Sequence, residues 1–358
     1  DNWHSTKCLL TSKLAIRTRA DGGVAFRVPL NDGKAIPALG LGTFLGFDED
    51  GVKDVEDQEV ELPVTWALKA GYRMLDTAAA YDNEEQVGSG VRASGVPREH
   101  VYIVTKLASH EQRDVIGSLK KSLERLNMSY VDLYLIHTPV AHKADHSGFD
   151  IIDYLDTWKG MEEAKKLGLA KSIGISNFNV SQIERILANC EIKPAVLQVE
   201  VCFTSFLIKK NHQNPFNQSK VNLNLAQNKL LEFCKAHDIV VMAYTPFGSL
   251  FSKESGPPPP RANDPTLVEL AKKYNKTTPQ ISLRYLVQRG VVPIPKSVNK
   301  NRIEENIQVF DFKLTNEEME NLAKFNKDYR VVFPSFWQDH PYYPYEQVDV
   351  PAPDLFKG

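Results

Sequence analysis

The 358-residue sequence lacks several features that would each place it in a particular class of protein. It contains no apolar run near the roughly 20 residues that a membrane-spanning helix needs. Its formal net charge of −2 offers no electrostatic basis for binding nucleic acid or an anionic membrane surface. We also find no internal repeat of the kind that builds solenoids. We therefore expect no nucleic-acid and no membrane partner.

Cysteine is scarce and its spacing is irregular. The four cysteines, Cys8, Cys190, Cys202 and Cys234, form neither the short pairs of a zinc site nor a dense disulfide framework. We interpret them as reduced thiols, which favours a cytoplasmic location.

Metal-ligand motifs are lacking as well. His137, His142 and His146 lie close in the sequence, but no His-Glu-x-x-His pattern accompanies them. His142 and His146 are more typical of solvated loop residues, so we predict no metal site.

The glycines near the N-terminus do not form a dinucleotide-binding fingerprint. Gly40, Gly42 and Gly46 come near to G-x-G-x-x-G, but the third glycine is one position late and acidic residues follow it where a helix should open. A Rossmann domain is therefore not expected.

What the sequence does contain is a regular alternation of strand and helix signals. Amphipathic stretches such as 114–126, with Asp114 as a plausible N-cap, separate the apolar runs. With a first strand at 39–42, eight strands are available, which predicts a closed (β/α)8 TIM barrel; a doubly wound open sheet is the alternative. The other runs lie at 72–76, 101–106, 131–137, 169–175, 195–201, 239–244 and 291–295.

A segment at each end of the chain flanks the expected barrel. We expect residues 1–25 to be a flexible leader, residues 26–345 to form the barrel, and residues 346–358 to be a C-terminal tail. The barrel should begin with an N-terminal β-hairpin, whose Asp32-Gly33 turn would supply positive φ angles. Long active-site loops include a proline-rich stretch at 247–265.

Three successive apolar runs end in titratable residues. Asp76 and Tyr81 follow the first, Lys106 ends the second and His137 ends the third. The carboxyl ends of barrel strands are where chemistry is done. Tyrosine, with a pKa near 10, is a poor acid unless an ammonium favours its phenolate. Lys106 could do this with Asp76 as counter-ion, while His137 donates a hydrogen bond to a carbonyl oxygen.

With these residues the chain resembles the aldo-keto reductase superfamily over roughly residues 26–345. Within it, the segments Asn222-Leu-Asn-Leu-Ala-Gln and Phe336-Trp-Gln-Asp-His-Pro-Tyr-Tyr-Pro resemble the insect 3-dehydroecdysone reductases. The motifs of the resemblance are Gly40-Leu-Gly-Thr-Phe, Asp76-Thr-Ala-x-x-Tyr81, Thr105-Lys106-Leu, Leu135-Ile-His137, Gly174-Ile-Ser176-Asn177-Phe178, Gln198-Val-Glu200, Ala243-Tyr244-Thr-Pro and Ile294-Pro-Lys296-Ser297-Val298.

The resemblance implies a monomeric NADPH-dependent carbonyl reductase. Tyr81 would be the general acid, Lys106 and Asp76 its activators, and His137 the group that orients the carbonyl. Lys and Arg are also what a 2′-phosphate needs. The implied cofactor-binding residues are Gly42, Thr43, Phe44, Asp76, Ser176, Asn177, Gln198, Tyr244, Thr245, Pro246, Phe247, Gly248, Ser249, Lys296, Ser297, Val298, Asn299, Arg302, Glu305 and Asn306.

Departures from the family suggest the substrate. Reductases of the family often have tryptophan where this chain has Phe44, Ala108 and Thr138. Loss of three indoles should widen the pocket, which favours a bulky apolar ketone or aldehyde, possibly a 3-dehydroecdysteroid. The expected substrate-binding residues are Phe44, Tyr81, Ala108, His137, Thr138, Phe333, Phe336 and Trp337.

Two alternatives stay open. The chain could be a family member that binds NADPH with little turnover, as a crystallin or a channel subunit would. Residues 202–221, which interrupt a family motif, are either a genuine insertion beside the site or a gene-model artefact.

Overall fold

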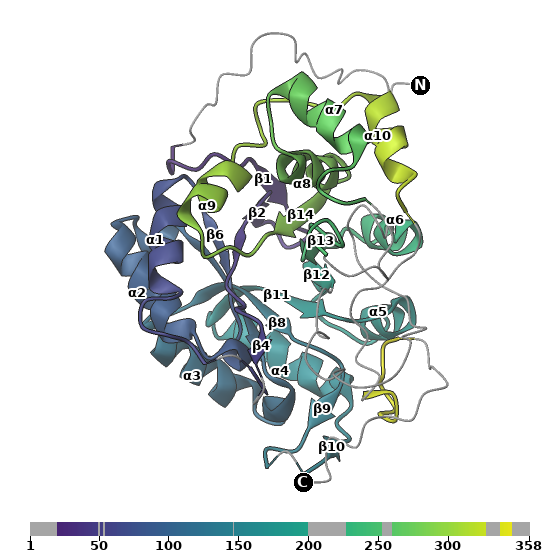
Figure 1. The fold of residues 1–358 in the computed structure, drawn as a ribbon. Coiled ribbons are helices and arrows are strands. Elements are labelled where there is room, and N and C mark those ends of the chain that lie inside the picture. Colours follow the sequence, from purple (N-terminus) through teal and green to yellow (C-terminus); the bar gives the residue numbers. More distant parts are fainter. Residues whose placement is uncertain are drawn as a thin grey trace, which may run out of the picture.

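Eight parallel strands form one sheet in the computed structural model (Figure 1), which describes residues 20–48, 51–52, 54–145, 147–199, 227–252, 260–326 and 337–345. Their order in the sheet follows their order in the chain, so each strand pairs with its predecessor. They are β3 (Leu41–Gly42), β6 (Met74–Asp76), β7 (Tyr102–Leu107), β8 (Val131–Ile136), β11 (Ala170–Ser176), β12 (Val196–Val199), β13 (Val240–Tyr244) and β14 (Val291–Ile294).

The first and last strands meet and close the sheet. Gly40 N donates to Pro293 O at 3.1 Å, and Gly42 N donates to Pro295 O at 3.1 Å. Gly42 also forms a parallel bridge with Lys296. The predicted (β/α)8 barrel is thus confirmed, and the open doubly wound sheet is not what the chain forms.

Helices surround the barrel and cover the outer faces of its strands (Figure 1). The predicted helix at 114–126 is confirmed as α3, where the Asp114 side chain accepts from Gly117 N at 2.8 Å. Among the described residues, no helix is both long and apolar enough to cross a membrane. The helices are α1 (Glu61–Lys69), α2 (Glu84–Ser94), α3 (Val115–Leu126), α4 (Tyr154–Lys166), α5 (Val180–Leu187), α6 (Asn228–Ala236), α7 (Pro265–Tyr274), α8 (Thr278–Gln288), α9 (Lys300–Asn306) and α10 (Asn316–Ala323).

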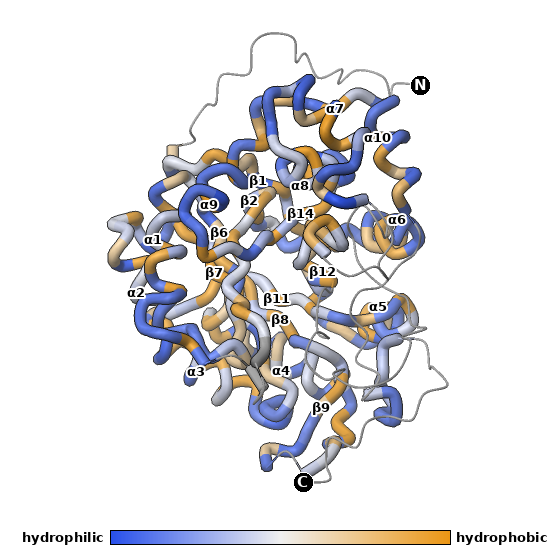
Figure 2. Tube along the Cα trace, viewed as in Figure 1, coloured by the Kyte–Doolittle hydropathy of each residue, from blue (hydrophilic) through white to orange (hydrophobic). Residues whose placement is uncertain are grey.

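The alternation of side chains along the strands divides the apolar core in two. Ile103 belongs to the cluster between strands and helices, whereas its neighbour Val104 belongs to the cluster inside the barrel; Tyr134 and Leu135 divide in the same way. Figure 2 shows hydrophobic residues along the strands and hydrophilic ones on outer helices such as α2. The side chain of every second strand residue therefore points into the barrel.

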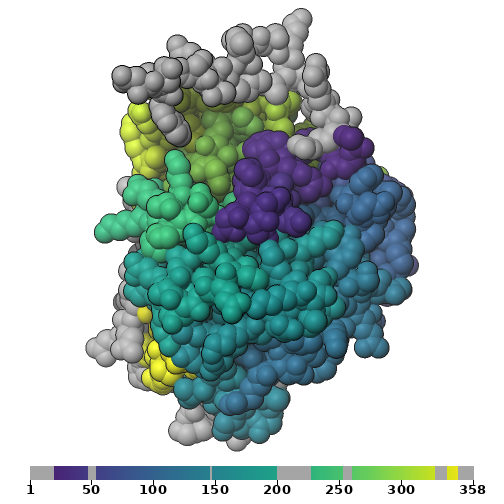
Figure 3. Space-filling model, turned by 180° about the vertical axis from the view of Figure 1, so that it is seen from behind, coloured from purple at the N-terminus to yellow at the C-terminus, as the bar shows by residue number. Residues whose placement is uncertain are grey.

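A hairpin covers the end of the barrel where the strands begin. Strands β1 (Arg27–Pro29) and β2 (Ala35–Pro37) pair antiparallel, as predicted. Leu30 and Ile36 join the inner apolar cluster. Of the two turn residues expected to have positive φ, only Gly33 does, at +79°. Figure 3 shows this purple segment lying against the middle of the chain.

Two further hairpins lie outside the barrel sheet. One consists of β4 (Phe47–Asp48) and β5 (Gly51–Val52), and the other of β9 (Ala141–His142) and β10 (Phe149–Asp150). The expected insert at 202–221, the leader up to residue 19 and the tail at 346–358 lie outside the described residues.

Candidate active site

Strand periodicity brings the predicted catalytic residues to one mouth of the barrel. Asp76 lies two residues after Met74, Lys106 two after Val104, and His137 two after Leu135. The three earlier residues all belong to the inner apolar cluster. Since side chains two apart share a face, the three titratable side chains continue the same inner rows at the carboxyl ends of β6, β7 and β8.

Lys106 is the centre of the site. Its Nζ donates to Asp76 Oδ1 at 2.7 Å, to the backbone oxygen of Thr77 at 2.9 Å and to the Tyr81 hydroxyl at 3.1 Å. An ammonium has three donors, and here each has an acceptor. Lys106 is 0% exposed, so this charge is held entirely by the protein. Asp76 uses its second oxygen to accept from Gln198 Nε2 at 2.6 Å.

The same contacts set the protonation of lysine and tyrosine. Burial by itself lowers the pKa of the Lys106 ammonium, but Asp76 and Tyr81 outweigh it and the pKa is raised. Burial raises the pKa of the Tyr81 phenol, and Lys106 opposes that rise without cancelling it. We expected Lys106 to lower the pKa of Tyr81; its contribution has that sign, but burial is larger. Tyr81 therefore keeps its proton at neutral pH.

His137 is held neutral beside the tyrosine. Its ring centroid lies 5.6 Å from that of Tyr81, in an edge-to-face arrangement. Burial, and then the Lys106 charge, lower the pKa of His137 to about 3. The neutral imidazole keeps one N–H that can donate to a carbonyl oxygen. Phe44 completes this wall, with its ring 4.8 Å from that of Tyr81.

Polar side chains at the ends of β11, β12 and β13 lie next to this group. Asn177 Nδ2 donates to the backbone oxygen of His137 at 2.9 Å, and the Tyr244 hydroxyl donates to Asn177 Oδ1 at 2.8 Å. Ser176 Oγ accepts from Asn177 Nδ2 at 3.2 Å. Gln198 donates an amide N–H to Asp76, and its amide oxygen can act as an acceptor. This donor and acceptor set suits a carboxamide such as that of nicotinamide.

The basic residues predicted for a phosphate follow β14, the strand that lies between β13 and β3. Lys296 and Arg302 are exposed, whereas Ser297 is buried and its Oγ accepts from Asn299 N at 3.1 Å. Asn299 caps α9 by accepting from Arg302 N at 3.1 Å. The two exposed cations are chemically suited to a phosphate monoester.

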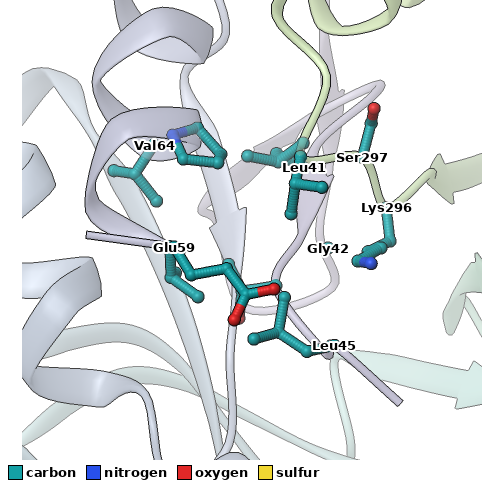
Figure 4. Close-up of a pocket in the computed structure, with 11 residues that line it drawn as sticks. Leu41, Gly42, Leu45, Glu59, Val64, Lys296 and Ser297 are labelled. Carbon is teal, nitrogen blue, oxygen red and sulfur yellow. The ribbon is translucent and has the colours of Figure 1, made fainter. Parts of the chain in front are cut away.

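Lys296 also lines a groove that extends between β3 and the start of α1 (Figure 4). One wall of it, which consists of Glu59, Val60, Pro63 and Val64 around the start of α1, was not predicted, because no motif marks these residues. Leu45 was missed as well. The rest of the lining is Leu41, Gly42, Thr43, Ser297 and Val298.

The remaining predicted cofactor residues lie in a turn and a helix. Residues 245–249 form the turn after β13, where Gly248 N donates to Thr245 O at 3.1 Å and Ser282 Oγ donates to Pro246 O at 3.3 Å. On α9, Glu305 accepts from Thr277 Oγ1 at 2.6 Å and Asn306 is buried. Phe247 is half-buried and Ser249 is buried in the same turn.

Some of the predicted substrate-binding residues are buried. Ala108 and Thr138 are 1% and 2% exposed, and Thr138 O accepts from Gln112 Nε2 at 2.9 Å. We expected both at an open mouth, but they are covered by protein, and their contact with substrate stays a prediction. Trp337 is half-buried and its ring lies 5.6 Å from that of His142. Phe333 and Phe336 lie outside the described residues.

The structure describes two of the three histidines of this region. His142 lies in β9 and packs against the rings of Phe149 and Trp337, so it is not the solvated loop residue we expected. His146 lies outside the described residues. In the ranges that the structure covers, no cluster of three or more His, Cys, Asp or Glu side chains could hold a metal ion.

A (β/α)8 barrel whose mouth holds a tyrosine hydrogen-bonded to a buried lysine, beside a neutral histidine, is suited to an enzyme that protonates a substrate oxygen. The sequence model of the Aldo/keto reductase family matches residues 38–327. The chain is 48% identical over 324 residues to aldo-keto reductase AKR2E4 of Bombyx mori, covering 88% of this chain and 97% of that protein. It is 40% identical over 336 residues to estradiol 17 beta-dehydrogenase 5 of Mus musculus, covering 89% and 97%.

Solved structures of aldo-keto reductases are also similar to this chain. The crystal structure of the Bombyx mori protein in complex with NADP has a TM-score of 0.78 and 46% identity, covering 90% of this chain and 99% of that one. Aldo-keto reductase AKR2E5 complexed with NADPH has a TM-score of 0.82 and 39% identity, covering 93% and 98%. The chain belongs to the aldo/keto reductase family, whose cofactor is NADP(H).

Proposed function

We propose that this aldo-keto reductase reduces a bulky apolar ketone or aldehyde to the alcohol, with Tyr81 as the proton donor. The observation behind the proposal is the hydrogen bonding of Lys106 Nζ, which joins the Tyr81 hydroxyl, at 3.1 Å, to the carboxylate of Asp76. A phenol bound to a buried ammonium holds its proton at neutral pH and can yield it when an oxygen beside it gains negative charge.

The residues divide the work as follows. His137 donates a hydrogen bond from its neutral ring to the substrate oxygen and so orients the carbonyl. Tyr81 transfers its proton to that oxygen, and Lys106 stabilises the phenolate that remains. Asp76 keeps Lys106 charged and in position. NADPH, when bound, supplies the hydride for the carbonyl carbon.

For the cofactor, Ser176, Asn177 and Gln198 would hold the nicotinamide carboxamide and Tyr244 would stack on its ring. Lys296 and Arg302 would hold the 2′-phosphate. Replacing Arg302 with alanine should weaken NADPH binding by roughly tenfold and leave NADH binding nearly unchanged, because only NADPH has this phosphate. An equal loss of affinity for NADPH and NADH would show that Arg302 does not contact the 2′-phosphate.

The proposed substrate class rests on Phe44, which of the three residues found in place of tryptophan is the one that is not buried, and on the relatives. The Phe44 ring is half-buried and lies next to that of Tyr81. The mouse relative, which is matched over 97% of its length, is named as a dehydrogenase of the steroid estradiol. A 3-dehydroecdysteroid has the size and apolar faces of such a ligand. Kinetics should compare an ecdysteroid 3-ketone with a small aldehyde. A larger kcat/KM for the small aldehyde would reject the bulky-substrate proposal and leave the reductase activity intact.

We further propose that the protein is a monomer, as the family resemblance implies, and that it is cytoplasmic, as its irregular cysteine spacing favours. Of the described cysteines, Cys190 and Cys234 are free thiols. Sedimentation of the purified protein would test the first point, and localisation of the tagged full chain the second.

A further inference from the structure

The Asn177 side chain makes four hydrogen bonds at the mouth of the barrel. A neutral amide side chain has two N–H donors and two acceptor positions. Here Nδ2 donates to His137 O at 2.9 Å and to Ser176 Oγ at 3.2 Å. Oδ1 accepts from the Tyr244 hydroxyl at 2.8 Å and from the Tyr345 hydroxyl at 3.3 Å. All four positions have a protein partner, which fixes the orientation of this amide. A nicotinamide carboxamide bound beside it would share one of these atoms in a three-centre hydrogen bond.

The backbone of Asn177 is constrained as well. Its φ is +63°, in the left-handed region that few residues other than glycine adopt. Its N–H donates to Gln198 O at 3.0 Å, and the residue is 9% exposed. Asn177 therefore joins the ends of three strands: β8 through His137, β12 through Gln198 and β13 through Tyr244.

Tyr345 is the one partner of this amide that comes from the C-terminal segment, 168 residues away in the chain. That segment is anchored to α5. Asn179 Nδ2 donates to Pro344 O at 3.1 Å, and Gln182 Nε2 donates to Tyr342 O at 2.8 Å. Asn179 and Gln182 are the two residues of the α5 capping box, so the helix start that follows Asn177 also positions the segment.

We propose that Tyr345 is a positioning residue for cofactor binding. Its hydroxyl fixes the Asn177 amide and, through the shared Oδ1, the Tyr244 hydroxyl. The ring of Tyr244 and the amide of Asn177 would then be preorganised before the cofactor arrives, which reduces the entropy lost on binding. The inference rests on the proposed placement of nicotinamide at Asn177 and Tyr244, and it adds the C-terminal segment to that site.

The test is Tyr345→Phe, which keeps the ring and removes only the hydroxyl. We expect the Kd of NADPH, measured by cofactor fluorescence with the full chain, to rise by roughly three- to tenfold, the usual effect of one hydrogen bond. Tyr342→Phe is the matched control, because Tyr342 reaches α5 through its backbone oxygen and packs its ring 5.1 Å from that of Tyr154. It should leave Kd within about twofold.

A double-mutant cycle separates positioning from a general loss of structure. If Tyr345 acts through Asn177, Tyr345→Phe should have no further effect on Kd in an Asn177→Ala background. Asn177→Ser replaces Asn177→Ala if the latter does not fold. Additive effects in the cycle, or an equal rise in Kd for Tyr342→Phe, would overturn the inference.

The two proposals fail in different ways. If Asn177→Ala leaves the Kd of NADPH unchanged, the proposed cofactor site is wrong, and the inference with it. If Asn177→Ala weakens binding but Tyr345→Phe does not, only the role of Tyr345 is wrong. None of these measurements requires the physiological substrate.

Discussion

The two ends of the barrel each contain a lysine–aspartate ion pair, and the pairs differ in burial and in what surrounds them. At the mouth, Lys106 and Asp76 have side chains 0% and 4% exposed. At the end closed by the hairpin, Asp32 pairs with Lys165, and these side chains are 9% and 21% exposed. Asp32 also accepts from Ser172 Oγ at 2.8 Å, so its partners hold it in place.

The difference lies in the third partner. Ser172 does not titrate in the physiological range, so the Asp32 pair ties the hairpin to the barrel and does no more. Tyr81, the third partner of Lys106, can lose a proton, so a change at the mouth pair alters the acidity of the residue that we propose as the proton donor. An ion pair of the same composition is therefore structural at one end and, on our proposal, chemical at the other.

The largest effect should come from Lys106→Met. Removing one partner of a fully buried pair leaves Asp76 uncompensated and should cost about 3–5 kcal/mol in the free energy of unfolding. Activity should fall to near background, because Tyr81 loses its ammonium. Thermal unfolding and NADPH oxidation measure the two effects. A stable and active variant would show that the mouth pair is no more essential than the one at the other end.

Tyr81→Phe should separate chemistry from stability at the mouth. We expect kcat to fall by about 10²–10⁴-fold, the usual contribution of a general acid. The melting temperature and NADPH affinity should change little, since Lys106 keeps its bonds to Asp76 and Thr77. Retention of more than a tenth of wild-type kcat would exclude Tyr81 as the proton donor.

Lys165→Met tests the other end. Asp32 would keep its bond to Ser172, and the pair is partly exposed, so we expect a loss of only about 1–2 kcal/mol of stability. Steady-state kinetics should match those of the wild type. A marked change in kcat would mean that the two ends of the barrel are coupled, against the distinction drawn above.

The smallest effect should be that of His137 on the pH dependence of kcat/KM. Its pKa of about 3 keeps the folded ring neutral between pH 5 and 8, so kcat/KM should show no inflection near pH 6.5 from this group. The unfolded ring binds a proton below its ordinary pKa of 6.5 and the folded ring does not, so its contribution to stability is complete above that value and declines as pH falls. An inflection near 6.5 that His137→Asn abolishes would contradict this.

Much of the site could be predicted because strands impose a strict period. Lys106 and His137 each follow an apolar run, and the two-residue repeat places them on the inner face as soon as the fold is a barrel. The buried state of Ala108 and Thr138 could not be predicted, because it depends on how the polypeptide after each strand packs. The wall containing Glu59 was missed for the same reason.

The sequence by itself determined the barrel, the family and the identity of the four residues at its mouth, because these follow from local periodicity and from motifs that are short in the chain. Only the tertiary structure decided the electrostatics. Burial of Tyr81 outweighs the effect of Lys106 on its pKa, and the Asn177 amide draws its partners from β8, β13 and a segment 168 residues away. Desolvation and long-range hydrogen bonds depend on what surrounds a group in three dimensions, and that is not encoded in any short stretch of sequence.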